Sequence, residues 1–274
     1  INLIIQGPGW RAAYVFVGAA SLVVILPCSL IMRKKPTDMG LAPYGCENVS
    51  GKGESLPVMR GASVKVVVAS LAFWCLFVFA GIASFIHGGI GQHMPGYIVS
   101  IGFTTSFSAL VVSAASIGSV FDKLVMGWLN DKIGVRRTTV IELVCIMVGI
   151  VGFVILRNPA ALIVSTVLFG VQDSLMSVSL PLLIRDIFGS RNYTQIHAWI
   201  RTGVGLFGSV SGVAVGAVYD QTGTFAPAFL GLAATCAVAI VAIALAYRSR
   251  KTIVWATEDG TPCSKPELPS LHMR

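Results

Sequence analysis

The feature that most constrains the fold is a short charged segment at residues 127–137, which separates two long apolar runs. Upstream, residues 103–126 carry only Asp122 and Lys123 as charges, and downstream, residues 140–156 carry only Glu142. An α-helix rises about 1.5 Å per residue, so each run is long enough, or nearly so, to cross a hydrocarbon layer of about 30 Å. We therefore predict two antiparallel membrane helices joined by a charged turn at a membrane surface.

The composition supports a membrane protein. Hydrophobic residues make up 55% of the chain and charged residues only 12%, against about 25% charge in an ordinary soluble domain, and the mean hydropathy is +0.80. The net charge of +8 could indicate a nucleic-acid partner, but the basic residues cluster at the ends of apolar runs rather than along a polar face. We therefore predict an all-α, polytopic membrane helix bundle that lies in the lipid bilayer and binds no nucleic acid.

Cysteine usage and motifs argue against an enzyme, a metal site or a cofactor. Cys28, Cys75, Cys145 and Cys236 lie inside apolar runs, and the chain has no CxxC pair, so small buried side chains are a better interpretation than disulfides or metal ligands. The sequence also lacks HExxH, GxSxG and any clustered His/Cys set. We therefore expect neither an intramembrane enzyme nor a resident metal or cofactor.

Seven apolar runs predict membrane crossings, and the basic residues orient them. The expected crossings are residues 10–32, 66–97, 104–126, 138–156, 160–184, 198–218 and 225–247. Lys and Arg follow the first, third, fifth and seventh crossings, whereas the alternate connections hold only Arg11 and Arg157. By the positive-inside bias, the base-rich connections and the carboxyl terminus face the cytoplasm. Residues 33–65, rich in Gly, Pro and Ser, are expected to form a linker, and residues 249–274 a disordered tail.

An internal sequence repeat indicates that the membrane helices follow a repeated arrangement. The pattern Gly127-x-x-x-Asp131-x-x-Gly134 recurs about ninety residues later as Gly216-x-x-x-Asp220-x-x-Gly223, and a Gly-Ser-Val triplet precedes each copy. Three crossings separate the copies, so they are expected on opposite membrane faces. Inverted three-helix repeats of this kind build several transporter folds, which place the substrate site at the repeat interface.

The charged segment resembles the loop signature of the major facilitator superfamily, which occurs between the second and third helix of each half. The matching residues are Gly127, Leu129, Asp131, Lys132, Gly134, Arg136 and Arg137, while Val135 stands where the signature usually has another base. Residues 9–45 look like that family's sixth helix and the start of its central loop, and residues 216–229 look like the turn between its eleventh and twelfth helices. The resemblance implies that helices six to twelve are present and one to five are missing.

The resemblance also implies the domain organisation. Residues 1–32 would be the last helix of the N-terminal half, residues 33–65 the cytoplasmic linker between halves, residues 66–248 the C-terminal six-helix domain, and residues 249–274 the cytoplasmic tail. The chain opens at Ile1 without a start methionine and is expected to be the later part of a longer carrier of the cell membrane. Its partner would then be the missing N-terminal half.

The loop is expected to act as a gate. Asp131 at a helix end can accept backbone N–H bonds or pair with Arg136 and Arg137, and could latch neighbouring helices in one state of a transport cycle. The predicted gating residues are Gly127, Asp131, Lys132, Gly134, Arg136 and Arg137. The alternative interpretation is that this turn only orients and anchors the helices.

The hypothesis about which substrate is transported rests on Lys123. A base at membrane depth is costly and is a functional hypothesis by default, and Lys123 continues a helical stripe of small or polar residues that includes Ser116 and Ser119. In the branch that resembles monocarboxylate and oxalate/formate carriers, a base four residues before the signature glycine meets the substrate carboxylate, and Lys123 stands at that place. The alternative is an internal pair with Asp122, or a side chain that extends to the membrane surface.

Other polar residues in the spans complete the predicted site. Gln172 joins Lys123, Ser116 and Ser119 as a substrate-binding candidate, while Asp173, Asp122, Arg201 and His93 are candidates for proton coupling or a counter-ion. Surface anchoring competes as a role for Arg201, and lining a helix end without chemistry competes for His93 and for His87.

Together the sequence and the resemblance predict secondary active transport of a small, monocarboxylate-like organic anion by alternating access, with proton symport or exchange. Two alternatives stay open. The first is a carrier for another solute, such as a drug, a sugar or an amino acid, and the second is a membrane sensor that binds without transport.

Overall fold

The computed structural model describes residues 10–31, 61–256 and 262–263. The chain divides into two compact units, Ile1–Pro57 and Val58–Arg274. In the first unit the described element is helix α2 (Trp10–Ile31), which matches the crossing expected at residues 10–32. Its apolar part, Tyr14–Leu30, is shorter than the spans of the second unit. Most of the expected linker, residues 33–65, lies outside the described residues.

The second unit contains six spans that are long and apolar enough to cross a membrane. They are α4 (Leu71–Ser100), α5 (Thr105–Ile133), α6 (Val135–Ile155), α7 to α8 (Pro159–Phe188), α9 (Tyr193–Thr222) and α10 with its last turn (Ala226–Thr252). A short helix, α3 (Val64–Ala69), precedes α4. The prediction of an all-α polytopic bundle is confirmed, because each expected crossing after the linker is found as a helix.

Two of the expected crossings are interrupted in the structure. The second expected crossing is broken at Ser70, whose hydroxyl caps α4 by accepting a 3.3 Å hydrogen bond from the Phe73 N–H group. The fifth crossing consists of α7 (Pro159–Ser174), a π-helical segment η2 (Leu175–Ser179) and α8 (Leu180–Phe188). Pro181 accompanies this change of helix type because it has no N–H group to donate to the carbonyl one turn earlier.

The charged segment at residues 127–137 is a helical joint rather than a turn, which corrects the sequence prediction. Helix α5 continues through Asp131 to Ile133, and α6 begins at Val135. The chain reverses at Gly134, whose φ of 86° is a backbone conformation that L side chains rarely adopt. The reversal therefore depends on a single glycine.

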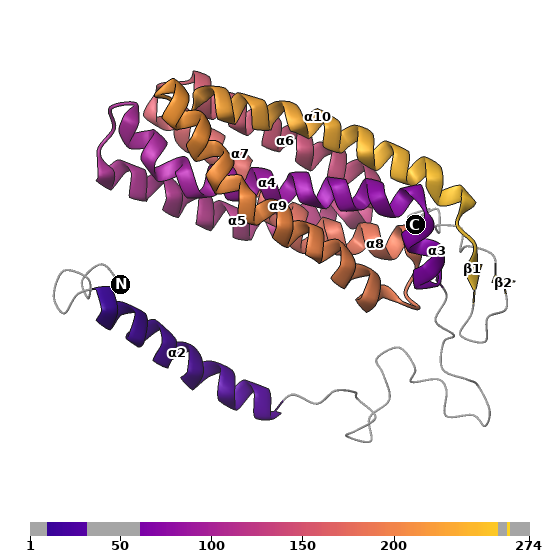
Figure 1. Cartoon of the computed structure of the whole chain (residues 1–274). Helices are drawn as coiled ribbons and strands as arrows, with labels where there is room; N and C mark the ends of the chain where they lie inside the picture. Colours follow the sequence, from indigo (N-terminus) through magenta and orange to yellow (C-terminus); the bar gives the residue numbers. More distant parts are fainter. Residues whose placement is uncertain (1–9, 32–60, 257–261, 264–274) are drawn as a thin grey trace. The chain divides into compact units, whose positions relative to one another are not determined.

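The helices of the second unit pack lengthwise around α4 (Figure 1). Helix α4 contacts α9 and α10, and α6 contacts α7 and α10. The backbones of α6 and α7 come close at Gly149, where a Cβ atom would lie 2.7 Å from the Phe169 nitrogen. Near the ends of α4 and α6 and the start of α10, the rings of Tyr97, Phe153 and Phe229 form an aromatic cluster, with centroids 5.0 to 6.2 Å apart. Tyr97 donates a 3.2 Å hydrogen bond to the Val154 carbonyl.

Two spans are much less covered than the others. In α5 and α9 only 17% of the apolar window is buried, compared with 50% in α4 and α6 and 56% in the span from α7 to α8. Large apolar side chains on these helices are open, including Phe121 at 63% exposure and Val213 at 74%. These open helices mark the face of the bundle that its own helices do not cover.

One end of the bundle collects the bases that the sequence assigns to the cytoplasm. The Ala62 N–H group donates to the Phe188 carbonyl at 2.9 Å, and the Arg136 guanidinium lies 5.4 Å from the centre of the Tyr247 ring. The start of the expected tail also packs here, because Ile253 and Trp255 are buried and Trp255–Ala256 pairs with Pro262–Cys263 as the antiparallel strands β1 and β2. The tail therefore differs from the sequence prediction at its first described residues.

Candidate functional site

A cavity of about 330 Å³ lies where four spans meet. Helices α4, α5 and α9 contribute to its wall, together with the last turn of α7 and the π-helical segment η2. The lining residues are Ser84, His87, Lys123, Asp173, Met176, Ser177, Arg201 and Val204. The cavity thus gathers three of the charged residues that the sequence had singled out, from three different helices.

The charges of this cavity are only partly neutralised. His87 Nδ1 lies 3.6 Å from Asp173 Oδ1, and both side chains are about half exposed to the hollow. Lys123 and Arg201 form no ion pair with any acidic residue in the part of the chain that the structure describes. Among the lining residues, Lys123 and Arg201 carry two fixed positive charges, and Asp173 is the one carboxylate. The cavity is therefore suited to a solute that brings its own negative charge.

The internal pair between Lys123 and Asp122 is not formed among the described residues. Asp122 instead faces α7: its Oδ2 atom is buried without a hydrogen-bond partner, and a Cβ atom at Gly170 would lie 3.5 Å from it. Adjacent residues on a helix point about 100° apart, so Asp122 and Lys123 turn to different neighbours. This geometry leaves the Lys123 ammonium directed to the cavity.

The other predicted substrate contacts do not line the cavity. Ser116 and Ser119 satisfy their hydroxyls on the backbone of α5 itself, at 3.0 Å to Val112 and 2.9 Å to Ser116. Gln172 is buried, and its amide donates a 2.9 Å hydrogen bond to the Ala83 carbonyl of α4. Gln172 therefore joins α7 to α4 behind the cavity wall.

The remaining predicted residues lie away from the cavity. His93 is bonded at 3.0 Å through Nε2 to the Gly212 carbonyl of α9 and packs against Phe225. In the gating segment, Asp131 makes no ion pair with Arg136 or Arg137 in the described structure. Lys132 lies over the Trp128 ring at 4.1 Å. Gly127 has open space where a side chain would go.

Three polar groups of this cavity, namely Ser84, His87 and Ser177, were not among the site residues predicted from sequence. A spacing signal was available: Ser84 and His87 stand three residues apart, and Asp173 and Ser177 stand four apart. Residues at these spacings share a helix face. Two such polar pairs on two apolar spans indicate polar helix faces that can line one cavity.

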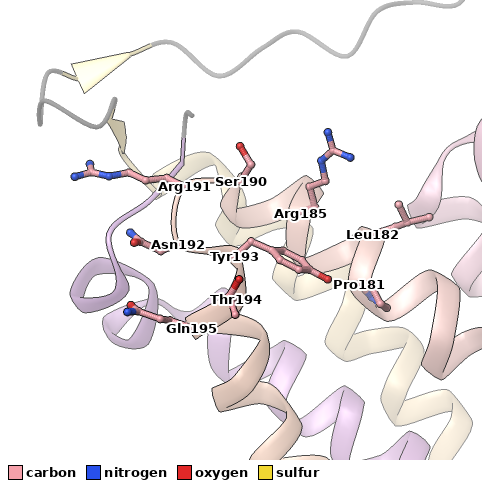
Figure 2. Close-up of a pocket in the computed structure, with 9 residues that line it drawn as sticks. All are labelled: Pro181, Leu182, Arg185, Ser190, Arg191, Asn192, Tyr193, Thr194 and Gln195. Atoms are coloured by element: carbon pink, nitrogen blue, oxygen red, sulfur yellow. The ribbon is translucent and has the colours of Figure 1, made fainter. Parts of the chain in front are cut away.

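A second, larger hollow of about 610 Å³ lies at the base-rich end of the bundle, in the connection from α8 to α9. Figure 2 shows the Tyr193 ring extending from α9 toward Pro181 on α8, while the Arg185 and Arg191 side chains point away from this ring. All of its lining residues lie within residues 181–195, which comprise most of α8, the connection and the start of α9. The smaller cavity is the better candidate for cargo, because four spans converge on it and its charges face inward.

A sequence model of the Major Facilitator Superfamily matches residues 2–160 and again residues 102–267. The chain belongs to this superfamily. The expected match of the charged joint and of the flanking spans to the family is thus confirmed at the level of the superfamily. No curated protein matches the chain.

Solved transporter structures share the fold of this superfamily member. The E. coli fucose:proton symporter is 14% identical, with a TM-score of 0.61, over 89% of this chain and 55% of the symporter. A peptide transporter in complex with alafosfalin is 18% identical, with a TM-score of 0.58, over 66% of this chain and 39% of the transporter. A bacterial homologue of the human lysosomal transporter Spinster is 16% identical, with a TM-score of 0.52, over 88% and 58%.

The chain spans between 39% and 58% of these solved structures. At such low identity the similarity shows the fold alone. Membership of the superfamily and six spans establish an integral, multi-pass membrane protein of a transporter family rather than an enzyme.

Proposed function

We propose that the parent carrier moves a small organic anion of the monocarboxylate type across the cell membrane by alternating access, and that Lys123 binds the carboxylate. The observation that carries this proposal is that Lys123 lines a cavity built by four spans and has no ion-pair partner among the described residues. An ammonium at membrane depth needs a compensating anion. A substrate carboxylate supplies that charge each time the carrier is loaded.

Arg201 supports the same substrate class as a second base on the opposite wall. It lines the cavity together with Lys123, from α9 rather than α5. A guanidinium presents paired N–H donors that match a carboxylate. A neutral sugar would leave both cations unpaired, whereas a small organic anion neutralises one of them.

His87 and Asp173 supply a proton-binding pair inside the cavity in this proposal. Their side chains lie 3.6 Å apart and open to the cavity, where water and protons reach them. Binding of a proton to this pair reduces the negative charge of the cavity and strengthens its attraction for an anion. Proton symport and anion exchange both fit this chemistry, and the similarity in fold to a fucose:proton symporter favours protons as the coupling ion.

The missing N-terminal half is the proposed partner, and it would cover α5 and α9. These helices have the least buried apolar windows of the six spans, and both contribute residues to the cavity wall. The joint at residues 127–137 then meets the partner half at its inner rim, where exposed Asp131, Arg136 and Arg137 are available as a gate. The base-rich end, with the carboxyl terminus, faces the cytoplasm in this orientation.

The test is Lys123→Gln in the complete parent carrier, reconstituted into liposomes and assayed with labelled lactate and oxalate as probe anions. A charge-assisted hydrogen bond contributes about 1.5–3 kcal/mol, so the KM for a transported anion should rise at least about tenfold. Uptake with an unchanged KM would contradict the carboxylate role of Lys123.

The matched control is Arg248→Gln, which removes one positive charge from the exposed end of α10 and leaves the cavity intact. Its KM should equal that of the wild type. Labelled glucose and alanine serve as probes of the alternative cargo classes. Transport of either of these, with no transport of any anion, would contradict the anion proposal.

A further inference from the structure

A second buried carboxyl group lies behind the cavity wall, on a helix that contributes nothing to the cavity. Glu142 on α6 has no exposed surface, and neither of its carboxyl oxygens has a hydrogen-bond partner. Burying an ionised carboxylate without a partner costs far more than burying a neutral acid. The protonated form of Glu142 is therefore the one that fits this conformation.

Glu142 faces the π-helical segment η2 and the residue before it. Ser174 and Ser179 lie close enough for their hydroxyls to interact with its carboxyl group. Both serines are fully buried, and the Ser174 Oγ atom is itself without a partner. On α5, Asn130 donates a 3.2 Å hydrogen bond to Ser179, while its own Oδ1 atom remains unpaired. This polar cluster thus holds more acceptors than donors, which a proton on Glu142 corrects.

The same segment forms part of the cavity wall from its other side. Met176 and Ser177 of η2 line the cavity, and Asp173 stands directly before Ser174. The Ser177 hydroxyl donates a 2.6 Å hydrogen bond to the Asp173 carbonyl. π-Helical turns inside α-helices occur frequently at functional sites. The segment η2 therefore lies between Glu142 and the cargo cavity, and residues in or next to it approach both.

Glu142 is the acid of the polar cluster that it forms with Ser174, Ser179 and Asn130, and the other titratable groups lie outside this cluster. The other charged or titratable residues on the elements packed against α6, and on α6 itself, are Asp122, Lys123, Asp131 and Lys132 on α5, Asp173 on α7, Arg185 and Asp186 on α8, Cys236, Tyr247 and Arg248 on α10, and Arg136, Arg137 and Cys145 on α6. Among the described residues, Glu142 forms no ion pair with any of these bases.

We propose that Glu142 is a proton-binding site separate from the cargo cavity, and that its loss of the proton reorganises η2 and so changes the cavity wall. The O–H bond of the neutral acid breaks, and the proton leaves to water at the inner end of the bundle. The carboxylate then takes hydrogen bonds from the hydroxyls of Ser174 and Ser179. This inference rests on the proposed transport function for its role in the cycle, but the proton site itself does not depend on the cargo.

Hydrogen–deuterium exchange of the complete parent carrier, compared over a pH series and corrected for intrinsic exchange rates, tests the site without any substrate. In the wild type, exchange in residues 174–180 should change with pH, and Glu142→Gln should remove that change. The isosteric amide keeps the volume of the buried side chain. Thr166→Val, which alters another buried polar residue of α7, should behave as the wild type. An identical pH response in the wild type and in Glu142→Gln would overturn the proposal.

A second variant keeps the proposal testable if Glu142→Gln fails to fold. Ser174→Ala removes one hydroxyl that would stabilise the carboxylate, so the change in exchange should move to higher pH. An unshifted midpoint would contradict the role of Ser174 and of this cluster.

Transport assays separate this inference from the proposed function. In liposomes, Glu142→Gln should lose accumulation driven by a proton gradient while anion counterflow continues, whereas Lys123→Gln should impair both. Accumulation in Glu142→Gln that still follows the proton gradient would overturn the coupling role. Wild-type exchange in residues 174–180 that responds to sodium at constant pH would overturn it in favour of a metal-cation site.

Discussion

The Tyr247 hydroxyl at the end of α10 donates a 2.7 Å hydrogen bond to the Asp186 carboxylate at the end of α8. Arg250 completes the contact, with its Nη1 atom 3.3 Å from the same carboxylate, and both charged side chains are more than four-fifths buried. Arg136 of α6 lies over the Tyr247 ring. This cluster joins three spans at the base-rich end of the bundle, far along the chain from one another.

Tyr247→Phe should destabilise the bundle. It leaves a largely buried carboxylate with one hydrogen bond fewer, and a hydrogen bond to a charged group contributes about 1.5–3 kcal/mol. The unfolding temperature of the detergent-solubilised protein should fall by several degrees. Tyr219→Phe is the control, because the Tyr219 hydroxyl has no hydrogen bond among the described residues. A Tyr247→Phe protein as stable as this control would contradict the role of the cluster.

Gly149→Ala should separate α6 from α7. A Cβ atom there would lie 2.7 Å from the Phe169 nitrogen and 2.8 Å from the Ser165 carbonyl oxygen, both backbone atoms that cannot move aside alone. Overpacking of this kind costs about 1–3 kcal/mol. Thermal unfolding should show the loss, while Gly231→Ala in α10, which meets nothing within 4 Å, should leave stability unchanged. Equal stabilities for the two variants would show that the helices do not approach as described.

The two glycines of the charged joint should respond differently to alanine. Gly134 has a φ of 86° and a ψ of 151°, a backbone region that is essentially restricted to glycine and costs other residues about 1–3 kcal/mol, so Gly134→Ala should lower the unfolding temperature. Gly127 faces open space, so Gly127→Ala should keep the stability of the wild type. A gating role at this position predicts slower transport by Gly127→Ala in the complete carrier. Wild-type transport rates would refute that role for Gly127.

Arg201 should affect anion affinity through its charge and its geometry. Arg201→Gln removes one of the two cations of the cavity, and the KM for a transported anion should rise about tenfold. Arg201→Lys keeps the charge but loses the paired donors, so its KM should lie between that of the wild type and that of Arg201→Gln. Uptake kinetics in liposomes give both values. If Arg201 only anchors the helix at the membrane surface, Arg201→Lys and Arg201→Gln should both leave the KM unchanged.

Much of the fold was predictable because membrane helices are governed by few rules. Length, apolarity and the placement of bases identified every span of the second unit. The break at Ser70 and the π-helical segment were not predictable in this way, because both depend on local capping and on a proline effect that hydropathy does not report. The continuous helix through Asp131 was missed because charged residues resemble a turn, whereas positive φ at Gly134 alone reverses the chain.

The candidate site was predicted in part, since charge at membrane depth is conspicuous in sequence. Lys123, Asp173 and Arg201 were selected for that reason, and all three line one cavity. Gln172 was selected as a polar residue at membrane depth, but its amide donates to the backbone of α4, and sequence does not distinguish a bridging amide from a lining one. His87 was passed over in favour of His93, because the helical rotation that separates them becomes decisive only when the neighbouring helix is in place.

The π-helical segment η2 has a mechanical consequence for the helix that follows it. A π turn takes up one residue more than an α turn, and each residue of an α-helix accounts for about 1.5 Å of length and about 100° of rotation. If η2 relaxed to regular α-helix, α8 would advance by about one such step relative to α7. Since α8 carries Asp186 toward Tyr247 and Arg250, a change of pitch beside the cargo would be transmitted as a screw motion to the far end of the bundle.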